Sequence, residues 1–369
     1  MSNSPFMAPS SRRRVREAAH RRRRRRRRVL TGITLILAIL AVAALITLVH
    51  PWHTHASAAT PQRGRRTATN AGAAGRAATA HLALSPIGLP LGRPPLALDL
   101  ADAAADPIHL ASPEQPRAGL LFNLDTGQVL WQLHPFARLR IASLTKMMTA
   151  LLTVRSGGPD TPVLITPQAE ETSGSKVGEL PLGHHVSLET LLYGLLLPSG
   201  NDAAVALAQH DAGSVKRFVA EMNAQAATLG MGCTHYSSPS GYYNTHNYSC
   251  AADLAELAHA DLEQPRIAHV TRTYVAIRRF PIKGGKLYLY NNNPLLIYHY
   301  HGVTGLKTGY TIEAGRCLVA TAERHGVRLG VVLLHSPAPG TQARNLLDDA
   351  FEHVYHQRPV PEAPMPPDA

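Results

Sequence analysis

Residues 141–154 read IASLTKMMTALLTV, and the rest of the chain is best interpreted outward from this stretch. Its apolar residues predict a buried helix that begins near Ser143 and runs to Val154. Ser143 and Lys146 are three positions apart, so the helix places both side chains on one face. The N–H groups at the start of a helix favour negative charge there. A buried, neutral Lys146 could therefore take the proton of Ser143, which makes this pair a candidate nucleophile and base.

Two other polar motifs follow in the chain. Ser199-Gly200-Asn201 separates LLYGLLLP from DAAVALA, and a short turn between apolar helices would present its side chains into a cleft. Lys307-Thr308-Gly309 lies within VTGLKTGYT and is expected on a strand, where glycine allows close approach of a ligand. The plain alternatives are a helix cap and the end of a surface strand. The order and spacing of the three motifs favour one common site.

The same S-x-x-K pattern occurs a second time, from Ser173 to Lys176. It lies in the polar, glycine-containing stretch ETSGSKVGEL, without a helical apolar period behind it. We interpret it as a loop, so the pattern alone is weak evidence for catalysis.

Strand patterns lie near both ends of the folded region. Apolar runs flank Asp125-Thr126-Gly127 and His325-Gly326, which predicts two hairpins. Helical patterns lie between them, and a last helix is expected over 341–357. The sequence therefore predicts an α/β (α+β) fold, in which an antiparallel sheet is made from both chain ends and covered by helices. The intervening helical patterns are 188–210 with a break at Pro198, 214–229 with a Ser214 N-cap, and 250–262.

The three motifs together resemble those of penicillin-binding proteins and serine β-lactamases. The stretches ASLTKMMTALLT, LLYGLLLPSGNDAAVALA and GLKTGYTIEAGRCLVATA are most similar to the D-alanyl-D-alanine carboxypeptidases of low molecular mass. The resemblance covers roughly residues 115–355. It implies a β-lactamase/transpeptidase-like fold with an all-helical subdomain. It also implies a serine hydrolase that removes the terminal D-alanine from peptidoglycan stem peptides ending in D-Ala-D-Ala, and that is acylated by β-lactam antibiotics.

The resemblance also assigns roles to individual residues. Ser143 is the nucleophile, Lys146 its base, and Ser199, hydrogen-bonded to the lysines, passes a proton to the leaving D-alanine. The backbone N–H groups of Ser143 and Tyr310 form the oxyanion hole. Asn201 holds the substrate amide. The complete set of expected substrate-binding residues is Asn201, Lys307, Thr308, Gly309 and Tyr310.

Other functions remain open from the sequence. A β-lactamase on the same fold would need an added deacylating carboxylate, and Glu221, Glu256 and Glu263 all lie in or beside predicted helices. An endopeptidase and an inactive wall-associated protein are further alternatives. No cofactor and no metal are expected, because the 20 histidines lack carboxylate or cysteine partners at ligand spacing.

The N-terminal region predicts the compartment. Eight consecutive arginines end at Arg28, and 21 uncharged, largely apolar residues follow at 29–49, enough to cross a bilayer. The positive-inside rule then places residues 1–28 in the cytoplasm and the rest of the chain outside the cell membrane. We favour an uncleaved signal anchor, with cleavage near Ala58 as the alternative.

The remaining boundaries follow from composition and charge. Residues 50–107 are rich in Ala, Pro, Thr and Gly and are expected to be a disordered linker. The catalytic domain is expected over 108–357, followed by a disordered Pro-rich tail at 358–369. The first 80 residues contain 16 of the 37 basic residues, so the folded region is slightly acidic and nucleic acid is not an expected partner.

Three cysteines complete the sequence-based expectations: Cys233, Cys250 and Cys317. In an exported domain the first two could form a disulfide, which would leave Cys317 over. Three buried thiols are the alternative, and the sequence does not decide between them.

Overall fold

The computed structural model describes residues 83–100, 105–178, 180–242, 246–281, 284–361 and 365–366. The expected cytoplasmic arm and the expected membrane span at 29–49 lie outside these residues. None of the helices in the described part of the chain has the length and hydropathy to span a bilayer.

The centre of the fold is a five-stranded antiparallel sheet with the order β2-β1-β11-β10-β9. The two predicted hairpins are present, so the first and last parts of the domain pair directly, β1 with β11. This confirms a sheet built from both chain ends. The strands are β1 Ala118–Asn123, β2 Val129–Leu133, β9 Val303–Thr311, β10 Gly315–Arg324 and β11 Val327–Ser336.

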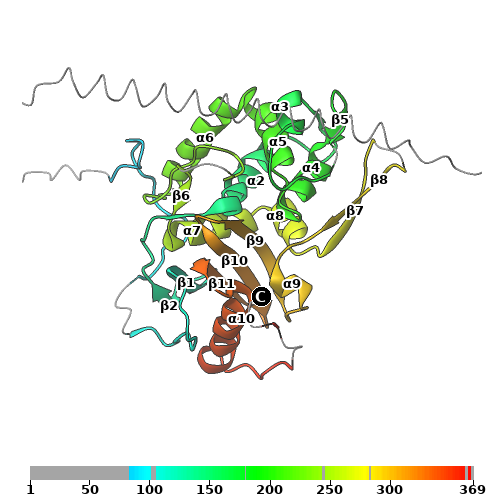
Figure 1. Cartoon of the computed structure of the whole chain (residues 1–369). Helices are drawn as coiled ribbons and strands as arrows, with labels where there is room; N and C mark the ends of the chain where they lie inside the picture. The colour runs from blue at the N-terminus through cyan, green and yellow to red at the C-terminus, as the bar shows by residue number, and fades with distance from the viewer. Residues whose placement is uncertain are drawn as a thin grey trace, which may run out of the picture. The chain divides into compact units, whose positions relative to one another are not determined.

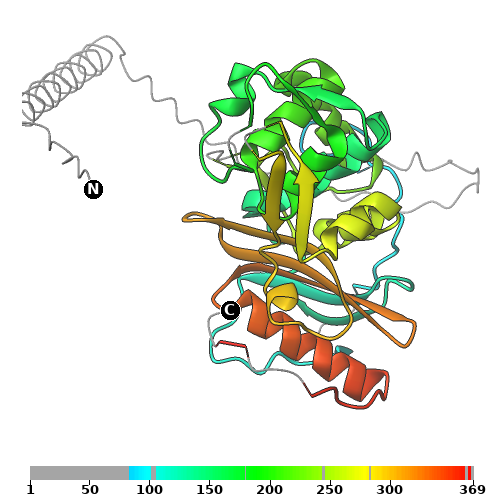
Figure 2. The ribbon, with the colours of Figure 1, turned by 90° about the vertical axis from the view of Figure 1, so that its right-hand side faces the viewer.

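Both faces of this sheet are buried, as its alternating side chains show. Leu121 and Val331 pack on one side with α10 (Pro339–Asp349) and the π turn Ala350–Val354 that follows it. Leu120 and Phe122 pack on the other side with the helices of the middle of the chain. Figure 2 shows the sheet lying between α10 and this helical body.

The helical body contains the predicted break at Pro198 and the predicted Ser214 cap, whose side chain accepts a hydrogen bond from the Arg217 N–H. Its helices (Figure 1) are α2 Thr145–Ser156, α3 Pro167–Glu170, α4 Leu188–Leu196, α5 Asn201–Ala212, α6 Val215–Thr228, α7 Ala251–Leu262 and α8 Pro265–Thr271. The short helix α9 Pro294–Ile297 lies on the other side of the sheet, where Leu295 packs in the same core as α10. Short strand pairs join this body: β3 Leu139–Arg140 with β6 Tyr248–Ser249, β4 Pro162–Leu164 with β5 His185–Ser187, and β7 Val275–Arg279 with β8 Lys286–Tyr290. The antiparallel sheet flanked by helices is the fold class expected from the sequence.

The expected disordered linker over 50–107 needs correction for residues 83–100, which pack against the domain. The Leu96 side chain is buried, and its N–H donates to Glu256 Oε2 over 2.9 Å. Gly92 N–H donates to the Ala227 carbonyl at the end of α6 over 2.8 Å. The Pro-rich composition suppresses regular structure, but an extended segment can still bury an occasional leucine and satisfy its backbone on its neighbours.

Candidate active site

The predicted Ser143–Lys146 pair is present at the start of α2. Ala142–Leu144 form a single 3-10 turn that leads directly into this helix. Lys146 Nζ lies 2.8 Å from Ser143 Oγ, within hydrogen-bond distance. The lysine is fully buried, whereas the serine lines an open cleft. This is the geometry in which an amine can take the proton of a hydroxyl.

The Ser199-Gly200-Asn201 turn lies beside this pair, between α4 and α5. Lys146 Nζ donates to Asn201 Oδ1 over 2.8 Å, and also to the Ser240 carbonyl over 3.1 Å. Asn201 therefore orients the amine. Ser199 has a left-handed backbone, with φ of 69°, and it lines the same cleft.

One expected contact of Ser199 is wrong. In the part of the chain that the structure describes, its buried hydroxyl oxygen has no hydrogen-bond partner, so it is bonded to neither lysine. Lys146 Nζ instead lies within hydrogen-bond distance of Ser143 Oγ, Asn201 Oδ1 and the Ser240 carbonyl, and these contacts occupy the two N–H groups and the lone pair of the neutral amine.

Strand β9 brings the third motif against the nucleophile. A Cβ placed on Gly309 would lie 2.9 Å from the Ile141 carbonyl oxygen and 3.1 Å from the Ser143 nitrogen, closer than such contacts normally allow. Glycine is therefore required for this approach of strand and turn. Lys307 is buried and its Nζ donates to the Thr308 carbonyl over 3.0 Å.

The two lysines differ in what shifts their pKa. Burial, followed by the neighbouring charge of Lys307, holds the pKa of Lys146 well below its ordinary value, while Asp202 acts in the opposite direction. Burial alone lowers the pKa of Lys307 to about 7. The lowered pKa makes Lys146 a more available base than an ordinary lysine, and Lys307 can still carry charge near pH 7.

The three motifs meet at one cleft with a volume of about 380 Å³. It is lined by Ser143, Ser175, Ser199, Asn292, Pro294, Thr308, Gly309, Tyr310, Arg316, Cys317 and Pro339. Among the described residues, the lining contains a hydroxyl nucleophile and a guanidinium but no carboxylate. Glu256 is hydrogen-bonded to Leu96, and Glu263 lies 3.6 Å from the Arg328 guanidinium, so neither serves this cleft.

Two features of the cleft were not found from the sequence. The second S-x-x-K motif lies in a loop, as expected. This loop also supports the site, because the Ser173 carbonyl accepts a hydrogen bond from the Asn201 side-chain nitrogen and the Ser175 carbonyl accepts one from the Asn201 backbone nitrogen. Asp202 holds the same loop by accepting from the Val177 N–H. Arg316, which pairs with Tyr310 across β9 and β10, adds a cation to the cleft. The sequence signal for Arg316 is its place on the strand that follows the K-T-G strand, which puts it opposite Tyr310.

Replacing Gly309 with alanine is expected to lower the rate of serine acylation at this site by about 10- to 100-fold, because the new methyl group displaces β9 from the nucleophile. The second-order rate constant for labelling by a serine-reactive acylating agent would measure it. Gly158→Ala is the matched control, since a Cβ there meets no atom within 4 Å. Equal loss in both variants would contradict the proposed packing role.

Comparisons with known proteins identify the family. A family model described as D-alanyl-D-alanine carboxypeptidase (peptidase family S11) matches residues 110–338, which include all three motifs. The chain belongs to the D-alanyl-D-alanine carboxypeptidase family. This confirms the family inferred from the motifs.

Individual members of the family are similar over most of the folded region. D-alanyl-D-alanine carboxypeptidase DacF of Bacillus subtilis is 34% identical over 254 residues, which span 67% of this chain and 64% of that protein. A D-alanyl-D-alanine endopeptidase of Pseudomonas aeruginosa is 34% identical over 218 residues, 58% of this chain and 70% of that protein. The crystal structure of a D-alanyl-D-alanine carboxypeptidase from Mycobacterium tuberculosis is 33% identical, covers 67% of this chain and 94% of its own, and superposes with a TM-score of 0.62.

Proposed function

We propose that this family member is a serine D-alanyl-D-alanine carboxypeptidase that removes the terminal D-alanine from peptidoglycan stem peptides. The observation that carries the proposal is the 2.8 Å contact between Lys146 Nζ and Ser143 Oγ in a cleft that also contains Arg316. The activated hydroxyl supplies the nucleophile, and the cations favour a substrate that ends in a free carboxylate.

The proposed reaction has two steps. Lys146 takes the hydroxyl proton while Ser143 Oγ attacks the carbonyl carbon of the penultimate D-alanine. The backbone N–H groups of Ser143 and Tyr310 stabilise the oxyanion, at about 2.7–4 kcal/mol for each donor. The peptide bond breaks as the proton held by Lys146 passes through the Ser199 hydroxyl to the leaving amine, and free D-alanine departs. Water then hydrolyses the acyl ester and restores the hydroxyl.

The remaining polar residues of the cleft bind the substrate in this proposal. Asn201 holds the stem-peptide amide with the amide group that also positions Lys146. Thr308 and Arg316 of the cleft lining bind the terminal carboxylate together with the buried Lys307, and Gly309 lets the substrate lie along β9. A β-lactam presents a similar carboxylate next to a reactive carbonyl, so penicillin should acylate the same hydroxyl.

The direct test uses the purified full-length chain and a synthetic stem peptide ending in D-Ala-D-Ala. We expect stoichiometric release of D-alanine, and after treatment with penicillin a penicilloyl mass that peptide mapping assigns to Ser143. Hydrolysis inside a cross-linked muropeptide without release of terminal D-alanine would instead indicate an endopeptidase, the activity named for the Pseudomonas aeruginosa relative. Rapid turnover of penicillin would indicate a β-lactamase.

The pH profile should report the charge on Lys307. In the free enzyme its pKa is about 7, so the carboxylate-binding charge is lost as the pH rises above 7. We therefore expect kcat/KM for the peptide to fall on the alkaline side, mainly through a rise in KM. Lys307→Arg keeps its charge, and its alkaline limb should move to higher pH. A profile that is the same for both proteins would contradict carboxylate binding by Lys307.

We further propose that the catalytic domain lies outside the cell membrane, held by a span at residues 29–49. The support is the charge pattern, in which a run of arginines ends at Arg28 and an uncharged, largely apolar segment begins at the next residue. Protease added to intact spheroplasts should digest the catalytic domain and spare a tag placed before residue 1. Protection of the whole chain would overturn this placement.

A further inference from the structure

Cys233 and Cys250 lie opposite each other at the end of a short antiparallel pairing. His235 and Tyr248 exchange two backbone hydrogen bonds, of 3.0 and 3.1 Å. Thr234 and Ser249 are the next pair along, and their hydroxyl oxygens lie 2.7 Å apart. One further step in the same register brings Cys233 opposite Cys250.

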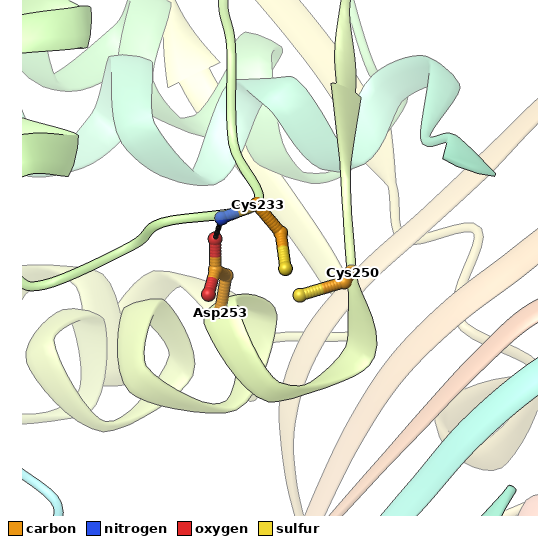
Figure 3. A group of neighbouring side chains, drawn as sticks. All are labelled: Cys233, Cys250 and Asp253. Carbon is orange, nitrogen blue, oxygen red and sulfur yellow. Dashed lines mark hydrogen bonds between the residues drawn. The ribbon is translucent and has the colours of Figure 1, made fainter. Parts of the chain in front are cut away.

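The side chains of the two cysteines turn toward each other. Figure 3 shows both sulfur atoms pointing into the space between the loop and the start of α7. The two sulfurs and a carboxylate oxygen of Asp253 all lie within 4.8 Å of one another, and both thiols are free in this structure. Opposed residues of an antiparallel pair have Cα atoms roughly 4.5–5.5 Å apart, within the range that a disulfide spans.

We propose that Cys233 and Cys250 are a redox pair that forms a disulfide when the domain meets an oxidising environment. The co-reactant is a thiol oxidant of the disulfide class, either a small molecule or another protein. One thiolate attacks a sulfur of the oxidant and releases a thiol. The second cysteine then attacks the mixed disulfide and releases the other thiol. The chain loses two protons and two electrons, and the oxidant's disulfide is reduced.

The surroundings assign the order of attack. Cys233 is only half-buried, and a hydrogen bond from the Cys250 thiol, followed by the nearby Arg138, lowers its pKa despite partial burial and Asp253. Cys250 is buried, which raises its pKa. Cys233 is therefore the accessible, more acidic thiol that reacts with the oxidant, and Cys250 resolves the mixed disulfide.

A metal site is the other chemistry that this cluster suggests, and the contacts favour it less. Asp253 Oδ2 already accepts from the Cys233 N–H over 2.7 Å and from Thr234 Oγ1 over 2.6 Å. Only three ligand groups are present in this described cluster, whereas structural zinc is held by four. The carboxylate is thus used to fix the backbone beside Cys233.

A disulfide between Cys233 and Cys250 would close a loop that supports the proposed active site. Between the two cysteines, the Ser240 carbonyl accepts from Lys146 Nζ, and the Pro239 carbonyl accepts from Thr149 Oγ1. Gly241 lies against the Ala142 carbonyl, next to the nucleophile. A disulfide between the loop ends restricts the unfolded chain and holds these carbonyls in place.

Thiol counting in the full-length protein tests the proposal. The chain is equilibrated with a mixture of reduced and oxidised glutathione, quenched, unfolded without reductant and treated with iodoacetamide. We expect one label, on Cys317, which serves as the internal control for complete alkylation. A peptide linking Cys233 to Cys250 should appear in the same digest. Three labels under these conditions would overturn the proposal, and bound zinc in that sample would assign the cluster to a metal.

Thermal unfolding provides the second measurement. Adding a phosphine reductant should lower the Tm of the oxidised chain by about 6–12 °C. The double variant Cys233→Ser with Cys250→Ser should show no response to the reductant. D-alanine release measured on the same samples separates the two proposals, because the disulfide can be absent from an active enzyme and present in an inactive one. An equal Tm in the oxidised and reduced wild-type chain would count against a stabilising bond.

Discussion

The Ser143→Ala variant is expected to lose at least about 10⁴-fold in the rate of D-alanine release and to form no penicilloyl adduct. The hydroxyl oxygen is the atom that forms the acyl bond, and it lies in the cleft lining 2.8 Å from the buried amine of Lys146. Removal of one oxygen leaves the cleft shape intact. The measurements are peptide turnover and the intact mass of the protein after exposure to penicillin.

The second S-x-x-K supplies the matched control for this experiment. Ser173 is exposed, and its contribution to the site is a backbone carbonyl that the alanine variant keeps. Ser173→Ala should therefore form the adduct as the wild-type chain does. Wild-type labelling in Ser143→Ala, or lost labelling in Ser173→Ala, would assign the nucleophile to the wrong motif.

Local rules were sufficient to predict the parts of the site that depend on neighbours in the sequence. The three-residue spacing of Ser143 and Lys146 predicted their contact, because helical geometry alone brings such residues together. The turn residues at 125–127 and 325–326 predicted the hairpins in the same way. The β-branched and aromatic residues of VAIRR at 275–279 and KLYLY at 286–290, which flank Gly284-Gly285, carry a similar hairpin signal for β7 and β8.

Contacts made through backbone carbonyls were not predictable from the sequence. The Ser240 carbonyl that accepts from Lys146 lies 94 positions away, and any residue type could supply it. The Ser173 and Ser175 carbonyls that accept hydrogen bonds from Asn201 also leave no pattern in the sequence. The missing bond between Ser199 and the lysines depends on distances set by the packing of α4, α5 and β9. The prediction that the K-T-G motif lies close to Ser143 likewise rested on the family resemblance and on the order of the motifs, not on local geometry.

The burial of Leu96 shows a different limit. Composition correctly indicated a segment without regular structure, but the absence of a period does not mean the absence of packing. Residues 83–100 have docking partners on α6 and α7 that only the folded domain creates. A boundary drawn from composition therefore began the domain too late.

Replacing Lys146 with methionine is expected to slow acylation by penicillin about 10²- to 10⁴-fold, the usual contribution of a positioned base. Methionine retains an unbranched side chain in the buried space but cannot take the proton of Ser143. The wild-type rate should also fall as the pH is lowered through the depressed pKa of Lys146, because the protonated amine is not a base. The variant should lack this acidic limb. Both are read from acylation rates measured across the pH range.

Lys176→Met separates loss of the base from loss of a positive charge. Lys176 is the lysine of the second S-x-x-K, and its side chain is 39% exposed, 3.9 Å from Glu170. It is therefore solvated, and its loss should leave both the acylation rate and the acidic limb in place. The Lys146 variant leaves the Asn201 oxygen and the Ser240 carbonyl without their donor, so its Tm must be measured beside its rate. A folded Lys146→Met protein that kept the wild-type acidic limb would show that another group accepts the proton of Ser143.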